Sequence, residues 1–267
     1  MHPSTSLDGG VDIIRLRRVV AVLLAGTMAV AACGGDDSST AADAGGDTVE
    51  SAGPEELAVG EQYLQALADG SFEQMIGISA PGSVADLYAR HTQALYEIQI
   101  DAGETPEERE VTVADETVTV AFTPPGAAAV RTEWTDFTLD REGDLVSFTI
   151  DGVALDDRLF VDGEPVRTGD VTAEVVSAFE LVSNDSPVVI VELTNQGDGD
   201  YRLLAAEYEA PDGTVEPTGP TGDGLVVPSG ASNRVALVFG TAEFGGTVIL
   251  QGEHGDTLLE HELPLSG

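Results

Sequence analysis

The segment 83–123, SVADLYARHTQALYEIQIDAGETPEEREVTVADETVTVAFT, changes its hydrophobic period partway along its length. Between Val84 and Ile98 the apolar residues recur every three or four positions, which is the spacing of one helix face. Ser83 precedes this run in a Ser-x-x-Asp pattern that is typical of a helix N-terminus. Between Val111 and Phe122 apolar and polar residues alternate, which is the period of a half-buried strand. The segment therefore predicts a helix followed by an antiparallel sheet.

Two shorter helical patterns precede this segment. The first begins at Pro54, a residue suited to the first helical position, with Gly53 before it as the N-cap. Gly70 ends that pattern, because glycine commonly follows the last helical residue. Ser71 and Gln74 then form a capping-box pattern at the start of a second short helix. We therefore expect three helices before the sheet.

The remaining chain alternates like β structure. Alternating segments at 130–139, 145–150, 159–161 and around Val166 continue the first sheet, so residues 54–167 are predicted to form one α+β domain of three helices plus an antiparallel sheet. Residues 168–267 show no convincing helical pattern. Short strands separated by Gly- and Pro-containing turns predict an all-β, immunoglobulin-like sandwich there. The predicted strands of this second domain are 171–182, 188–193, 201–209, 225–227, 235–239, 247–251 and 258–263.

The first 33 residues carry an export signal. Three arginines, the last of them Arg18, precede the uncharged apolar segment 19–32. That segment is shorter than the roughly 20 residues of a membrane-spanning helix and matches the apolar core of a signal peptide. It ends in Val30-Ala31-Ala32-Cys33, which resembles the bacterial lipobox. An ordinary cleaved signal with a chance cysteine, and an uncleaved signal anchor, are the alternatives.

The lipobox resemblance implies that Cys33 receives a diacylglyceryl group and becomes the first residue of the mature chain. We therefore expect 1–32 to be a lipoprotein signal peptide. Residues 33–53, rich in Gly, Ser, Ala and Asp, are expected to be a lipidated flexible tether. Several acyl chains attach a protein lastingly, because each buried methylene adds about 0.8 kcal/mol. The expected location is the extracytoplasmic face of the cell membrane.

The charge balance restricts the partners. The chain has 48 acidic and 11 basic residues, a formal net charge of -37, and all of its basic residues are arginines. Such a surface repels phosphate backbones, so nucleic-acid binding is not expected. It also repels anionic lipid headgroups, which leaves the lipid as the means of membrane attachment. Basic partner surfaces and divalent cations would be attracted, although an acidic surface that merely keeps the protein soluble is the plainer interpretation.

The second domain resembles the immunoglobulin-like, DUF4352-type domains of bacterial surface lipoproteins. The resemblance rests on a strand that ends in Asn, 188–195 (VVIVELTN), the turn 211–213 (PDG), and the corner 227–230 (VPSG) that leads into 235–239 (VALVF). It implies an extracytoplasmic interaction or spacer domain without enzyme activity. The antibody-type disulfide is excluded because the chain has one cysteine.

The first domain looks like the NTF2-like, or SnoaL-like, cone fold. The resemblance rests on 63–72 (YLQALADGSF), followed by a third helix and a sheet. It implies a conical pocket, which in that family serves as an active site, as a ligand site or as neither.

One group of residues is a candidate pocket in this cone. His91 lies on the apolar face of the third helix, and with Tyr63, Tyr88, Trp134 and Asp136 it could form a His–Asp site for acid/base chemistry. The alternative is a core histidine that is hydrogen-bonded to one neighbour. We find no nucleophile elbow, phosphate loop or nucleotide fingerprint.

Neither a metal nor a cofactor is expected. Asp198, Asp200 and Glu192 lack the ligand order of a calcium loop, so a Gly/Asp hairpin turn explains them better. His254 and His261 have no partner pattern for zinc. The sequence thus favours a non-enzymatic, lipid-anchored binding or adaptor protein of the bacterial cell envelope with a protein or cell-wall partner. A small-ligand receptor or an isomerase-like acid/base enzyme that uses the cone pocket is the alternative.

Overall fold

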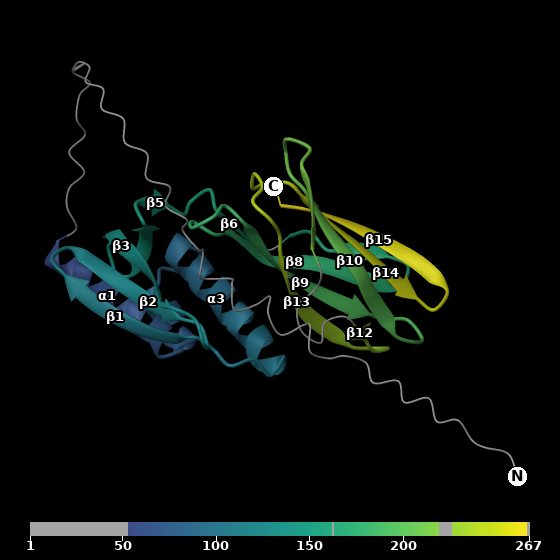
Figure 1. Cartoon of the computed structure of the whole chain (residues 1–267), viewed down its shortest axis with the longest axis horizontal. Coiled ribbons are helices and arrows are strands. Elements are labelled where there is room, and N and C mark those ends of the chain that lie inside the picture. Colours follow the sequence, from purple (N-terminus) through teal and green to yellow (C-terminus); the bar gives the residue numbers. More distant parts are fainter. Residues whose placement is uncertain (1–52, 162, 219–225, 266–267) are drawn as a thin grey trace, which may run out of the picture.

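The structure is a computed structural model that describes residues 53–161, 163–218 and 226–265. Three helices come first, α1 (Pro54–Ala68), α2 (Phe72–Ile78) and α3 (Val84–Asp101), and the described strands all follow them (Figure 1). This order of three helices and then antiparallel sheets is the one predicted. The predicted signal peptide and residues 33–52 of the tether, including Cys33, lie outside the described residues, as does Leu225 of a predicted strand.

The three helices begin at the predicted N-cap residues Gly53, Ser71 and Ser83, but one predicted capping bond is absent. Gly53 is the N-cap of α1 with proline next to it, and the Ser83 side chain accepts a hydrogen bond from the Asp86 amide at 3.3 Å at the start of α3. The capping box predicted at Ser71 is wrong, since its side chain makes no capping bond. The Ser71 backbone has ψ 62° rather than the extended value that turns a side chain over the first helical turn.

The first sheet has the strand order β1-β2-β3-β4-β5 and is antiparallel throughout. Its inward face carries large apolar side chains, among them Val118, Trp134 and Phe148, which are almost fully buried against the helices. Alternation along the strands places these residues on one face, and the helices cover that face. The strand bounds are β1 (Glu108–Ala114), β2 (Thr117–Thr123), β3 (Val130–Leu139), β4 (Leu145–Ile150) and β5 (Val153–Ala154).

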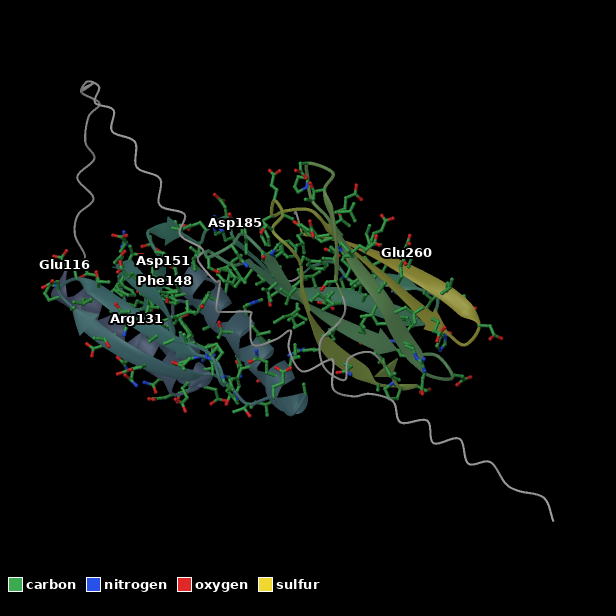
Figure 2. The ribbon with its side chains drawn as sticks, in the orientation of Figure 1. Glu116, Arg131, Phe148, Asp151, Asp185 and Glu260 are labelled. Atoms are coloured by element: carbon green, nitrogen blue, oxygen red, sulfur yellow. The ribbon has the colours of Figure 1, made fainter. Side chains whose placement is uncertain are left out.

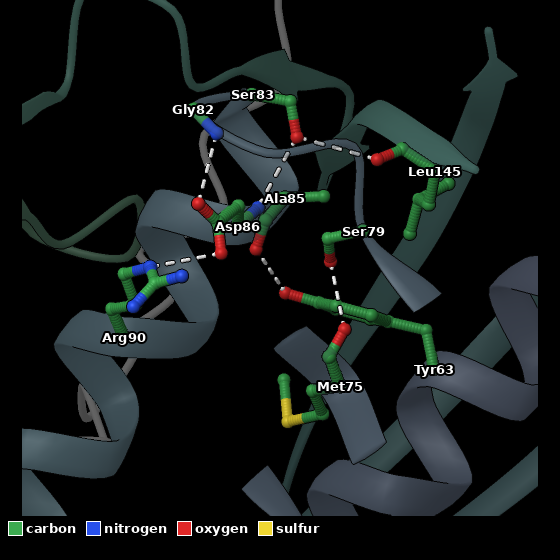
Figure 3. A network of polar contacts seen from close by, with 9 residues as sticks. All are labelled: Tyr63, Met75, Ser79, Gly82, Ser83, Ala85, Asp86, Arg90 and Leu145. Carbon is green, nitrogen blue, oxygen red and sulfur yellow. Dashed lines mark hydrogen bonds and ion pairs between the residues drawn. The ribbon is translucent and has the colours of Figure 1, made fainter. Parts of the chain in front are cut away.

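A small polar network joins the helices to this sheet (Figure 3). The Tyr63 hydroxyl on α1 donates to the carbonyl of Ala85 on α3 at 2.8 Å. The Ser83 hydroxyl donates to the carbonyl of Leu145 on β4 at 3.3 Å. The buried Asp86 carboxylate accepts from the Gly82 amide at 2.9 Å and from Arg90 at 2.9 Å. The start of α3 is thus held to α1 and β4 at the same time.

The second half of the described chain is built of two further antiparallel sheets. One has the order β13-β9-β8-β6 with β7 also on β8, and the other has the order β11-β10-β14-β15 with β12 also on β10. Side chains from both sheets form a common core that includes Val189, Tyr201, Leu237 and Leu250. The bounds are β6 (Leu159–Val161), β7 (Val166–Thr168), β8 (Val171–Glu180), β9 (Pro187–Asn195), β10 (Tyr201–Glu209), β11 (Val215–Thr218), β12 (Val226–Val227), β13 (Ser232–Val238), β14 (Thr247–His254) and β15 (Thr257–Pro264).

The strands β6 and β7 correct a prediction. They were expected to finish the first sheet, but both pair with β8 of the second half. The change of sheet therefore falls between β5 and β6. Arg158 fixes this passage, because its guanidinium lies 2.9 Å from a carboxylate oxygen of both Glu180 and Asp185, at the two ends of the turn after β8. The division of the chain into two domains between residues 167 and 168 stays a prediction.

One hydrophobic core runs from the first half into the second. Phe179 near the end of β8, Leu181 just after it, and Val188 from β9 belong to the same cluster as the first sheet and its helices. The Tyr88 ring lies 5.3 Å from the Phe179 ring, 5.6 Å from Trp134 and 5.7 Å from Phe148, each edge to face. Figure 1 shows α3 between the first sheet and the strands of the second half. The two halves are thus packed together through α3.

Candidate functional site

A cavity lies where α3 meets β8 and β9, between the two halves. Its volume is about 30 Å³. That is room for a water molecule or two, whereas sites for small organic ligands usually enclose about 300–1,000 Å³. Its lining residues are mostly apolar and come from α1, α3, β1, β2, β8 and β9: Leu67, Tyr88, His91, Thr92, Leu95, Tyr96, Gln99, Arg109, Phe122, Phe179, Leu181 and Val188.

Arg109 is the charged residue among those that line this cavity, and its guanidinium bonds to neighbouring protein groups. Its Nη1 donates to the Leu67 carbonyl at 2.9 Å, and its Nε and Nη2 lie 3.3 and 3.2 Å from one oxygen of Glu107. Its guanidinium carbon also lies 5.9 Å from the centre of the Phe122 ring. Burial raises the pKa of Glu107, and the charge of Arg109 opposes that rise. The pair joins β1 to the end of α1 and leaves the cavity largely apolar.

His91 points from α3 into the second half. It is 3% exposed, and its Nδ1 lies 2.9 Å from the Ser177 hydroxyl of β8, with the tautomer deciding which atom donates. A bulge between Val175 and Ser177 shifts the register of β8, and residues after such a bulge change the face to which they point. Burial lowers the pKa of His91 to about 4. The imidazole is therefore neutral at physiological pH.

The structure brings some of the five predicted pocket residues together. Tyr88 and His91 both line the cavity. Burial raises the pKa of Tyr88 to about 12, so its hydroxyl keeps its proton. Tyr63 and Trp134 lie in the same hydrophobic core, where the Tyr63 hydroxyl bonds to the Ala85 carbonyl and the Trp134 indole donates to Thr132 at 2.9 Å. The rings of Tyr88 and Trp134 are in direct contact, whereas Tyr63 and His91 are linked to them through Phe148 and Phe179.

Asp136 lies apart from this cluster. Alternation would set it on the same face as Trp134, two positions before it, but β3 is bulged between Thr135 and Thr138. Asp136 takes up the extra residue with φ 52°, and Phe137 occupies the inward position instead. The exposed Asp136 carboxylate accepts hydrogen bonds from the hydroxyls of Thr135 and Thr149. The His–Asp pair considered from the sequence is therefore not assembled.

Sequence reasoning did not single out the second-half residues at this cavity. Ser177 and Phe179 were placed in a strand, and nothing marked them as facing the first half. One signal was present. Alternation in β8 stops after Ser177, and the following residues, AFELV at 178–182, are apolar with a single exception. A strand whose alternation is lost is often buried on both faces, as the end of β8 is here.

A group of three carboxylates lies elsewhere, in the turn between β3 and β4. Among the described residues, Asp140, Glu142 and Asp144 are the acidic or histidine side chains that come close enough together to share a metal ion. Asp140 accepts hydrogen bonds from the backbone amides of Glu142 at 2.8 Å and Asp144 at 3.0 Å. This carboxylate therefore serves to close the turn, as Asp commonly does. Within the described residues, the acidic side chains near Asp198 and the histidine His254 do not belong to a group of this kind.

Comparison with known proteins adds no assignment. No protein-family model matches the chain, and no curated protein matches it. Among the described residues, none of the helices combines the length and the apolar composition that crossing a bilayer requires.

Proposed function

We propose that this protein is a lipid-anchored binding or adaptor protein of the bacterial cell envelope that acts without catalysis. The lipobox-like segment ending at Cys33 supports the anchor and the extracytoplasmic location. The three helices on a five-stranded sheet agree with an NTF2-like first domain. The two sheets around a common core agree with an immunoglobulin-like second domain. Folds of both types host many functions, so we infer the function from the site.

One observation carries this proposal. Phe179, Leu181 and Val188 of the second half occupy the space beside α3, where a cone fold would keep a ligand pocket. The cavity that remains is about 30 Å³, and its arginine is already paired. The packing of the two halves thus favours a rigid body that presents its outer surface over a receptor that encloses a metabolite.

The second candidate is a small-ligand receptor or an isomerase-like enzyme. The observation in its favour is His91, a neutral imidazole that lines the remaining cavity together with Tyr88. A neutral imidazole can accept a proton. It would need the second half to move before a substrate could enter.

Two measurements test the proposal. The first is partition of the full chain into a detergent phase, followed by mass determination of its N-terminus. We expect a lipid mass on Cys33 and loss of detergent partition in Cys33→Ser. An unlipidated, water-phase wild type would overturn the anchor.

The second measurement exposes the purified chain to a metabolite extract and identifies retained compounds by mass spectrometry. We expect wild type and His91→Ala to retain the same background. A compound that wild type holds and His91→Ala loses would replace the adaptor function with the receptor or enzyme.

A further inference from the structure

The outer side of β1 is an exposed sheet edge. Within the described residues no strand pairs with it, and its seven residues pair with β2 from end to end without a register shift. In an antiparallel strand alternate residues turn their amide and carbonyl groups to each side, so part of the β1 backbone points outward. Proteins commonly protect such edges with proline, lysine, bulges or short strands. The β1 sequence EREVTVA has no proline, lysine or bulge, and its inward-facing charge, Arg109, is already paired with Glu107. Its exposed charges are carboxylates, which repel an acidic strand but not a basic one.

Other sheet edges of the described chain are shorter, are already partly hydrogen-bonded or lack carboxylates. β5 has two residues, and β11 contains Pro217, which has no amide to donate. β15 is contacted by β7, and the Thr168 hydroxyl donates to the Glu260 carbonyl at 2.9 Å. β13 is as long as β1, but its sequence SNRVALV carries Arg234 and no carboxylate, so it offers nothing that attracts a basic segment. β1 is thus a long edge that keeps its pairing capacity.

The two faces of β1 differ in chemistry. Arg109 bonds to the end of α1 and Val111 packs against the core, so this row of side chains faces the helices, with Val113 continuing it 38% exposed. Alternation turns Glu108 and Glu110 to the opposite, solvent-exposed face. Arg109 is engaged with Glu107 and does not neutralise them. A strand added to this edge would meet carboxylates on one face and valines on the other.

We propose that β1 is a docking edge for an extended basic segment of a partner protein. The segment pairs with the β1 backbone and sets Lys or Arg beside Glu108 and Glu110, with apolar residues beside Val111 and Val113. The charges select this occupant. A second copy would bring the same carboxylates and a further net charge of -37 to the edge, and an acidic strand would be repelled likewise. The inference rests on the proposed adaptor function and names its surface.

The test uses the full chain in non-ionic detergent and a synthetic peptide that alternates Lys and Val over the length of β1. Amide hydrogen exchange is followed with and without the peptide. We expect slower exchange in 108–114, because the outward amides of the edge gain acceptors. A peptide of the same composition with its Lys residues gathered at one end should bind at least tenfold more weakly, because it cannot match both faces. Equal protection by both peptides would mean unspecific charge attraction and would overturn the docking edge.

A matched pair of variants locates the site. The double reversal Glu108→Lys with Glu110→Lys should weaken binding of the alternating peptide about tenfold or more, since two favourable cross-strand pairs become repulsive. The control is Glu260→Lys with Glu262→Lys, which makes the same charge change at the same spacing on β15, in the other half of the molecule (Figure 1; Glu260 is labelled in Figure 2). The control should bind like wild type.

Each remaining outcome decides one point. Equal weakening by both double variants refutes the site, as does concentration-dependent protection of 108–114 without peptide, which would indicate pairing with a second copy. If the peptide does not bind, β1 is not a docking edge, and the proposed adaptor function is unaffected. A metabolite retained through His91 removes the adaptor function whatever the peptide does.

Discussion

The buried His91 should make the stability of the fold depend on acid in a defined way. Its pKa is about 4 in the folded protein and has the ordinary value of 6.5 once unfolding exposes it. The unfolded chain therefore takes up a proton at higher pH than the folded chain. The contribution of His91 to the free energy of unfolding is fully present above pH 6.5. It declines as the pH falls from 6.5 and is lost below pH 4.

The magnitude follows from the same two values. The difference between 6.5 and about 4, at roughly 1.4 kcal/mol for each pKa unit, sets a full effect of about 3 kcal/mol. Between pH 7.5 and 5.0 the linkage relation yields a loss of about 2 kcal/mol, because the folded imidazole is still mostly neutral at the lower pH. Carboxyl groups such as Glu107 and Glu180, whose pKa values burial raises, act in the opposite direction. The effect must therefore be measured as a difference from a variant.

The variant is His91→Gln, which keeps a side chain able to bond to Ser177 and has no charge to gain. Urea unfolding is measured for both proteins at pH 7.5 and 5.0. The free energy of unfolding of wild type should fall by about 2 kcal/mol more than that of His91→Gln over this interval. Ser177→Ala is the control. It should lower stability by about 1 kcal/mol at both pH values and keep the acid sensitivity of wild type, because burial rather than this hydrogen bond lowers the pKa. Parallel pH profiles of wild type and His91→Gln would refute the burial argument.

Three further substitutions test the packing described above. Phe179→Ala should lower the free energy of unfolding in urea by about 3–5 kcal/mol, with both halves losing structure together. The control Leu258→Ala, at a 75% exposed position, should lower it by less than about 0.5 kcal/mol. Separate unfolding transitions would contradict the core that Phe179 shares with the first sheet and its helices. Gly252→Ala should cost about 1–3 kcal/mol in the same assay, because its methyl group would overlap the Tyr201 ring, and an unchanged stability would contradict this contact. Asp136→Asn should change stability by less than about 0.5 kcal/mol, since Asn tolerates the positive φ, and it should leave the pH profile intact; an altered profile would place Asp136 near His91 after all.

Local patterns were sufficient for most of the secondary structure. The change of period within 83–123 predicted α3 and the strands after it, and the structure confirms them. The predicted segments of the second half coincide with strands within a few residues, because side chains alternate wherever one face is buried. β5 and β11 were not predicted, since a two-residue strand and one that contains Pro217 carry little periodic signal. These are features that a window of neighbouring residues cannot show.

The geometry of the candidate site depended on which side chains face inward, and the hydrophobic period alone does not predict this where a strand is bulged. Counting by two places Asp136 beside Trp134, but one extra residue in β3 turns Asp136 outward and Phe137 inward. A similar bulge in β8 brings Ser177 to His91. Bulges alter the face of every residue beyond them, and their sequence signal is weak. The aromatic members of the predicted pocket gathered because they are large and apolar, which requires burial but no specific register.

The sequence by itself determined the extreme acidity, the helix-then-strand order and the burial of His91 on an apolar helix face, and it predicts an export signal that ends at Cys33. All of these depend on composition or on neighbours within one element. Only the tertiary structure decided that β6 and β7 join the second half, that Phe179 closes the space beside α3, and that Asp136 lies away from His91. These features arise from pairing and packing between segments far apart in the chain, where hydrogen bonding and burial select one register among several that the local pattern allows.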